Sequence, residues 1–205
     1  MAYLGHVGDL HVSIYDLCSQ LSTRVSVRSF LDLGSRHGEC LDHLDFGPGA
    51  IYTLVEPSPR CLPHIMSTME CHSERDIRLL EGVLGPSAGH VDLHVFEGDS
   101  DQSANIFSDR GGRYGRTTLI SVPILPYVSM DGHYDMAKVN IEGAEYALME
   151  DGFFDRLGSF VMEAHNVHVP GKKYTDLLDG LCGDFDITSH GDLSYKYCFL
   201  VGIRA

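Results

Sequence analysis

Residues 29–38 read SFLDLGSRHG, a short apolar run that leads into Asp32, Gly34 and Gly38. The run has the length of a buried strand, and its glycines indicate a tight turn into a following helix. Glycine at such a turn lets the backbone approach a ligand closely. The stretch therefore predicts the first central strand of an α/β fold, followed by a ligand-binding turn.

Helix and strand patterns alternate along the rest of the chain. Strands are expected at residues 50–56, 77–82, 90–96, 116–125, 134–141, 159–164, 184–189 and 196–203, and helices at 13–25, 39–44, 59–69, 143–154 and 172–182. Strands separated by helices indicate a mainly parallel, doubly wound sheet that binds ligands beyond the carboxyl ends of its strands. We expect one α/β domain over residues 1–205, with residues 1–28 as an N-terminal helical extension.

Composition excludes some classes of partner. The formal net charge is −14 with 15 Lys and Arg residues, which disfavours binding to nucleic acid. Asp9 and Asp16 interrupt the apolar N-terminal stretch, which argues against a signal peptide or membrane anchor. A cytoplasmic location is therefore expected. The six cysteines form no CxxC pair, so free thiols are predicted.

An acidic residue ends the second predicted central strand. Glu56 lies 24 positions after Asp32, where a carboxylate can accept hydrogen bonds from the ribose hydroxyls of a bound nucleoside. After the next strand, Gly82 and Val83 would reach the adenine edge. Two alternatives stay open: the glycine turn serves packing alone, and Glu56 caps the following helix.

The spacing of the glycine turn bears on the class of ligand. A dinucleotide site prefers GxGxxG, and Ser35 and Arg36 break that pattern. The form DxGxxxG suits a ligand without phosphate, such as S-adenosylmethionine, whose ammonium group would lie near Asp32. An NAD-dependent oxidoreductase and a non-catalytic cofactor-binding protein are the alternative hypotheses.

Several segments then resemble the FkbM family of S-adenosylmethionine-dependent methyltransferases. They read FLDLGSRHG (30–38), YTLVEPSPRC (52–61), GVLG (82–85) and KVNIEGAEYALMEDG (138–152). The resemblance, over about residues 30–165, implies a Rossmann-like class I methyltransferase fold with a final antiparallel strand. It also implies methyl transfer, usually to an oxygen of a sugar, polyketide or other small molecule. The chain departs from the family in lacking the Ala-Asn pair after the first glycine, and in having Asn140 where aspartate is commoner.

The resemblance also implies cofactor contacts. It assigns Asp32, Gly34 and Gly38 to the methionine end, Glu56 to ribose, Val83 to adenine, and Ser103, Ala104 and Asn105 to a small polar patch near the cofactor. The remaining candidate contacts are Ser35, Pro57, Ser58, Gly82 and Asn140.

The block at 138–146 carries the candidate acceptor side. In a strand, period two would place Lys138, Asn140 and Glu142 on one side, as a polar wall that holds an acceptor hydroxyl. A buried lysine needs a carboxylate partner, for which Glu142 and Glu163 are the candidates. Alternatively, Glu142 and Glu145 only complement a helix N-terminus.

The strand at 159–164 leads into His165. Period two places Glu163 and His165 on one face, and the usual pKa of histidine suits a general base for a hydroxyl proton. Glu163 would orient His165 or Lys138. A divalent metal held by Glu142, Glu145, Glu163 and His165 is left open.

Overall fold

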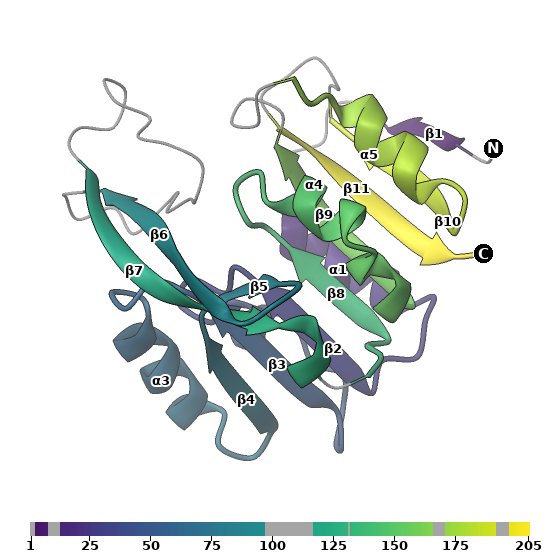
Figure 1. Cartoon of the computed structure of the whole chain (residues 1–205). Coiled ribbons are helices and arrows are strands. Elements are labelled where there is room, and N and C mark those ends of the chain that lie inside the picture. Colours follow the sequence, from purple (N-terminus) through teal and green to yellow (C-terminus); the bar gives the residue numbers. More distant parts are fainter. Residues whose placement is uncertain (1–2, 8–12, 97–116, 131, 166–170, 192–196) are drawn as a thin grey trace.

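The computed structural model describes residues 3–7, 13–96, 117–130, 132–165, 171–191 and 197–205. Its main feature is an eight-stranded sheet with the strand order β1-β10-β11-β9-β8-β2-β3-β4 (Figure 1). The strand β11 is antiparallel to both of its neighbours, and the other neighbouring pairs are parallel. The predicted fold class, a Rossmann-like and mainly parallel sheet with a final antiparallel strand, is confirmed.

The elements of this sheet and its helices follow most of the expected segments. The strands are β1 (Tyr3–Val7), β2 (Ser29–Leu33), β3 (Ile51–Glu56), β4 (Asp76–Glu81), β8 (Met136–Val139), β9 (Ser159–His165), β10 (Phe185–His190) and β11 (Tyr197–Arg204). The α-helices are α1 (Ile14–Ser22), α2 (Cys40–His43), α3 (Leu62–Cys71), α4 (Glu145–Glu150) and α5 (Tyr174–Leu181), and the 3₁₀ helices are η1 (Tyr127–Ser129) and η2 (Phe153–Arg156).

Helices pack on both faces of the sheet. Apolar residues of α1, α2 and α3 form one core with the sheet, and those of α4, η2 and α5 form another core on the opposite face. None of the helices in the described ranges is long and apolar enough to span a membrane. The six cysteines are free, as predicted, and four of them are buried.

A second, three-stranded sheet stands outside the main one. Its order is β5-β7-β6, with β5 (Val83–Gly85), β6 (Gly89–Phe96) and β7 (Thr117–Pro126). The strands β6 and β7 are antiparallel and form a ribbon that projects from the β4 side of the molecule (Figure 1). The alternation at 90–96 correctly predicts a strand, and the side chains of Leu93, Val95 and Val122 form a small separate core.

Two expectations differ from the structure. Residues 3–7 form a strand, β1, parallel to β10, so the N-terminal extension is not wholly helical. The strand expected at 134–141 is shorter, because the chain turns after Val139 and adopts positive φ at Glu142 (57°) and Gly143 (104°). The early end of β8 changes where the polar side chains of the 138–146 block point.

Candidate functional site

The glycine loop after β2 is built as a tight turn at the carboxyl edge of the sheet. The N–H groups of Gly34 and Ser35 donate to the carbonyl oxygen of Val55, at 3.0 and 3.2 Å. Gly34 has a φ of 77°, and a Cβ there would lie 2.0 Å from the carbonyl oxygen of Asn140. Only glycine fits this contact, which fixes the loop against the end of β8.

Replacing Gly34 with alanine is expected to lower the free energy of unfolding by about 2–5 kcal/mol, from left-handed strain together with the clash against Asn140. Gly49 is a matched control, because its φ is 85° and a Cβ there would meet no atom within 4 Å. Gly49→Ala should cost only the strain, about 1–2 kcal/mol. Urea denaturation of both variants measures the difference, and equal losses would contradict the close contact.

Ser35 stabilises the loop from within. Its hydroxyl donates to the carbonyl oxygen of Asp32 at 2.9 Å and accepts from the N–H of Val55 at 3.2 Å. The side chain is wholly buried, so it faces the protein rather than a ligand. Ser35 therefore shapes the loop, and its expected cofactor contact stays a prediction.

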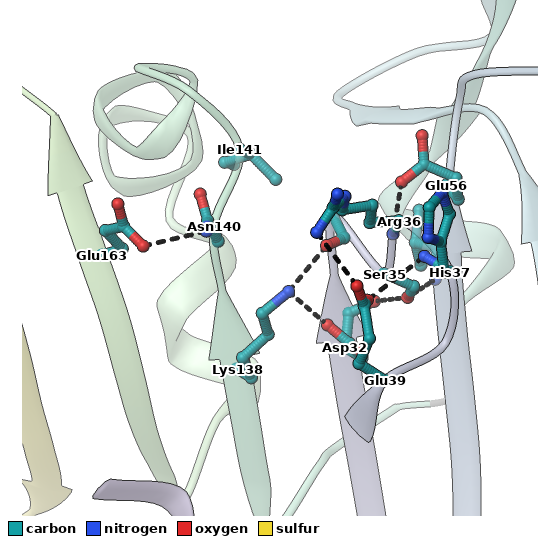
Figure 2. Close-up of polar contacts among 12 residues, drawn as sticks. Asp32, Ser35, Arg36, His37, Glu39, Glu56, Lys138, Asn140, Ile141 and Glu163 are labelled. Atoms are coloured by element: carbon teal, nitrogen blue, oxygen red, sulfur yellow. Dashed lines mark hydrogen bonds and ion pairs between the residues drawn. The ribbon is translucent and has the colours of Figure 1, made fainter. Parts of the chain in front are cut away.

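Lys138 and Asp32 form a buried ion pair beneath the loop (Figure 2). Lys138 Nζ lies 2.9 Å from Asp32 Oδ1 and donates to the carbonyl oxygen of Gly34 at 2.6 Å. Burial lowers the pKa of Lys138, but Asp32 outweighs burial and raises it. The expected partners, Glu142 and Glu163, are wrong, because Asp32 is the residue paired with Lys138 across β2 and β8. Asp32 is wholly buried and paired with Lys138, so its predicted contact with a cofactor ammonium group stays a prediction.

Glu56 lies at the end of β3, beside the glycine loop. Its two carboxylate oxygens accept from the N–H groups of Arg36 at 2.8 Å and Ser58 at 2.9 Å. Burial raises the pKa of Glu56, and these two hydrogen bonds oppose that shift. A carboxylate has about four acceptor positions, so Glu56 keeps capacity for a ligand hydroxyl while it also fixes the loop.

The residues expected near an adenine are only partly described. Gly82 donates its N–H to the carbonyl oxygen of Glu56 at 3.2 Å, so the predicted adenine edge lies next to the predicted ribose-binding residue. A Cβ at Gly82 would lie 2.6 Å from the carbonyl oxygen of Pro123. The remaining expected residues stand as follows: Val83 is partly buried at the start of β5, Pro57 is partly buried, Ser58 is buried, Gly38 has a φ of 79°, and Ser103, Ala104 and Asn105 lie outside the described residues.

The residues expected to hold the methyl acceptor lie around the end of β9. Asn140 Nδ2 donates to Glu163 Oε2 at 3.0 Å, on the side of β8 away from the glycine loop (Figure 2). His165 Nε2 lies 3.5 Å from Glu163 Oε1 and 3.8 Å from Glu142 Oε2. The predicted polar wall is therefore divided: Lys138 faces β2, while Asn140 and Glu142 face β9. Glu163 does contact His165, as predicted.

Glu145 is the main partner of His165. Its Oε1 lies 3.0 Å from His165 Nδ1 and also accepts from the N–H of Ile141 at 3.3 Å. The side chain of Glu145 is wholly buried in the first turn of α4. The sequence pattern predicts Glu145 beside Glu142 and among possible metal ligands, but it gives no sign of a pairing with His165.

The surrounding carboxylates set the charge state of His165. Burial lowers the pKa of His165, but hydrogen bonds with Glu145 and Glu163 and the charge of Glu142 raise it to about 10. At neutral pH the ring is therefore an imidazolium, which donates protons in hydrogen bonds and has no free lone pair. The ring would have to lose this proton before it could act as a general base, so the predicted role of His165 stays a prediction.

The same charge state bears on metal binding. Both ring nitrogens of His165 lie near carboxylates of Glu142, Glu145 and Glu163, an arrangement that suits a cationic ring among anions. Across the parts of the chain that the structure describes, no three His, Cys, Asp or Glu residues are arranged to hold a metal ion. The described geometry thus fits an ion-pair cluster rather than a preformed metal centre.

The strand order, with a glycine loop after β2 and an acidic residue ending β3, defines a class I methyltransferase fold. No family model and no curated protein matches the chain. Solved structures do. EvdMO1 matches with a TM-score of 0.55 and 16% identity, over 94% of this chain and 41% of EvdMO1, so the chain spans less than half of that protein.

Two further structures extend the comparison. The N-terminal domain of EvdMO1 with SAH bound has a TM-score of 0.55 and 12% identity, covering 96% of this chain and 82% of that one. The precorrin-6y C5,15-methyltransferase from Geobacter metallireducens GS-15 has a TM-score of 0.54 and 10% identity, with coverages of 93% and 87%. At these identities the likeness shows the fold.

Proposed function

We propose that this protein is an S-adenosylmethionine-dependent methyltransferase. The observation that carries the proposal is the position of Glu56, which ends β3 with its carboxylate against the glycine loop and with Gly82 beside it. This arrangement supports the proposal because the carboxylate, the glycine loop and Gly82 lie at the carboxyl ends of adjacent parallel strands, where such sheets bind ligands. The likeness to the SAH-bound domain of EvdMO1 supports the same cofactor.

Membership of the FkbM family is part of this proposal. The sequence segments that resemble that family include both halves of the site: the loop at 30–38 and the block at 138–152. The broken GxGxxG pattern disfavours the NAD-dependent alternative. The non-catalytic alternative predicts cofactor binding without transfer, so the two remaining hypotheses differ in turnover.

The acceptor is proposed to be a hydroxyl group of a small molecule, such as a sugar, a polyketide or another natural product. When bound, S-adenosylmethionine supplies an electrophilic methyl group. Asn140, Glu142 and Glu163 provide hydrogen-bonding groups on the β9 side that can orient a hydroxyl. Since His165 is protonated, the carboxylates of Glu142 and Glu163 are the proposed acceptors of the hydroxyl proton.

Calorimetric titration with S-adenosylmethionine and with SAH tests the cofactor. Wild type should bind both in the micromolar range, and Glu56→Gln should bind them at least about 10-fold more weakly, because a hydrogen bond to a charged group contributes about 1.5–3 kcal/mol. Glu70→Gln removes an exposed carboxylate on α3 and should bind as wild type does.

Thermal denaturation of each variant separates weaker binding from loss of the fold. Wild-type protein that binds neither ligand would contradict the proposed function. Binding followed by no methyl transfer to any of a panel of hydroxylated acceptors would favour the non-catalytic alternative.

A further inference from the structure

Arg36 has an unusual backbone conformation within the glycine loop. Its φ is 52°, in the left-handed region that non-glycine residues seldom adopt. The conformation is held because its N–H donates to Glu56 Oε2 at 2.8 Å. Strained backbone of this kind is concentrated at functional sites, where the surrounding structure over-determines it. The main chain of Arg36 is therefore fixed before any ligand arrives.

The side chain of Arg36 keeps donors to spare. Nη1 lies 3.1 Å from Glu39 Oε1, and the side chain is 40% exposed. Among the described residues, the buried Nε has no hydrogen-bond partner. In Figure 2 the side chain extends from the loop toward the end of β8, where Asn140 and Ile141 lie. A guanidinium group has five N–H donors, and of these only Nη1 has a hydrogen bond to a described side chain, that of Glu39.

The neighbouring cation, the ammonium group of Lys138, already has protein partners. Lys138 is buried, pairs with Asp32 and donates to the carbonyl oxygen of Gly34. On the other side of the loop, Glu56 has a carboxyl group, which offers an anionic ligand no positive charge. Of these two cations in the described part of the loop region, the partly exposed guanidinium of Arg36 is therefore the one that an anionic group over the loop can reach.

We propose that Arg36 binds the carboxylate of the amino-acid end of an S-adenosyl ligand. This inference rests on the proposed function and names the residue that binds the methionine end of the ligand. The planar guanidinium matches a carboxylate through paired hydrogen bonds, which lysine cannot reproduce. Glu39, three residues further along, holds the guanidinium near the loop and so limits the conformational freedom lost on binding.

The experiment compares two ligands that differ only in this carboxylate. Calorimetry is carried out with SAH and with its decarboxylated counterpart, which keeps the adenosine, the thioether and the amine. Wild type should bind SAH about 10- to 100-fold more tightly than the decarboxylated ligand. Arg36→Met should lose that difference: its affinity for SAH falls about 10- to 100-fold, while its affinity for the decarboxylated ligand changes less than about 3-fold.

Two further variants sharpen the result. Arg36→Lys keeps the charge but not the planar fork, and should recover only part of the discrimination. Arg24→Met removes an exposed arginine after α1 and should discriminate as wild type does. Melting temperatures are compared to confirm that each variant is folded.

The outcomes separate this inference from the proposed function. Equal losses for the two ligands in both Arg36 variants would overturn the carboxylate assignment and show that Arg36 only shapes the loop. Unchanged binding of SAH in Arg36→Met would overturn it as well. If wild type bound neither ligand, the proposed function would fall first, and the assignment with it.

Discussion

Lys138→Met is expected to lower the free energy of unfolding by about 3–5 kcal/mol, because it leaves the carboxylate of Asp32 buried without its counter-ion. Both side chains are almost fully buried, and Nζ lies 2.9 Å from Oδ1. The substitution also removes the hydrogen bond to the carbonyl oxygen of Gly34. Urea denaturation at neutral pH, followed by circular dichroism, measures the loss.

A double-mutant cycle tests the cause of this loss. Asp32→Leu alone should also destabilise strongly, since it strands the ammonium group of Lys138. The double variant Asp32→Leu with Lys138→Met replaces both charges by apolar groups, and should be more stable than either single variant. If the two losses were simply additive, the ion pair would not be the reason for the effect.

Glu145→Gln is expected to lower the pKa of His165 from about 10 by about 1–3 units, because it removes an opposite charge next to the ring. NMR titration of the imidazole resonances measures this shift directly. Glu150→Gln, at the exposed end of the same helix, is the matched control and should leave the pKa of His165 near 10. A wild-type pKa close to 6.5 would contradict the assigned charge state.

The raised pKa also predicts how stability depends on pH. The stabilisation from protonated His165 and its carboxylate partners is fully present below the unfolded-state pKa of about 6.5. It is lost as pH rises through the folded-state pKa of about 10. Wild type should therefore lose stability between these values faster than Glu145→Gln does. Denaturation midpoints at a series of pH values compare the two proteins, and parallel curves would argue against the pairing.

Much of the sheet could be predicted because its strands are short apolar runs bounded by turns. The end of β3 and the glycine loop could be paired from sequence, since the carboxyl ends of neighbouring parallel strands share one edge. The contact between Glu56 and the loop, through the N–H of Arg36, agrees with that expectation. Alternation also located β6 and β7, but periodicity does not say which sheet a strand joins.

The partner of Lys138 could not be predicted for a different reason. Period two assumes that a strand continues, whereas β8 ends at Val139 and Glu142 adopts a positive φ. The true partner, Asp32, lies opposite Lys138 on the adjacent strand, and this register depends on the strand order. The charge of His165 likewise depends on Glu145, a residue 20 positions away that only tertiary structure brings near.

The contact between Gly34 and residue 140 has a consequence for how such a site can evolve. The atom that excludes a side chain at position 34 is the main-chain oxygen of Asn140, which every amino acid has. The Asn140 side chain points away, to Glu163. Residue 140 can therefore exchange asparagine for aspartate while the steric limit on position 34 stays the same.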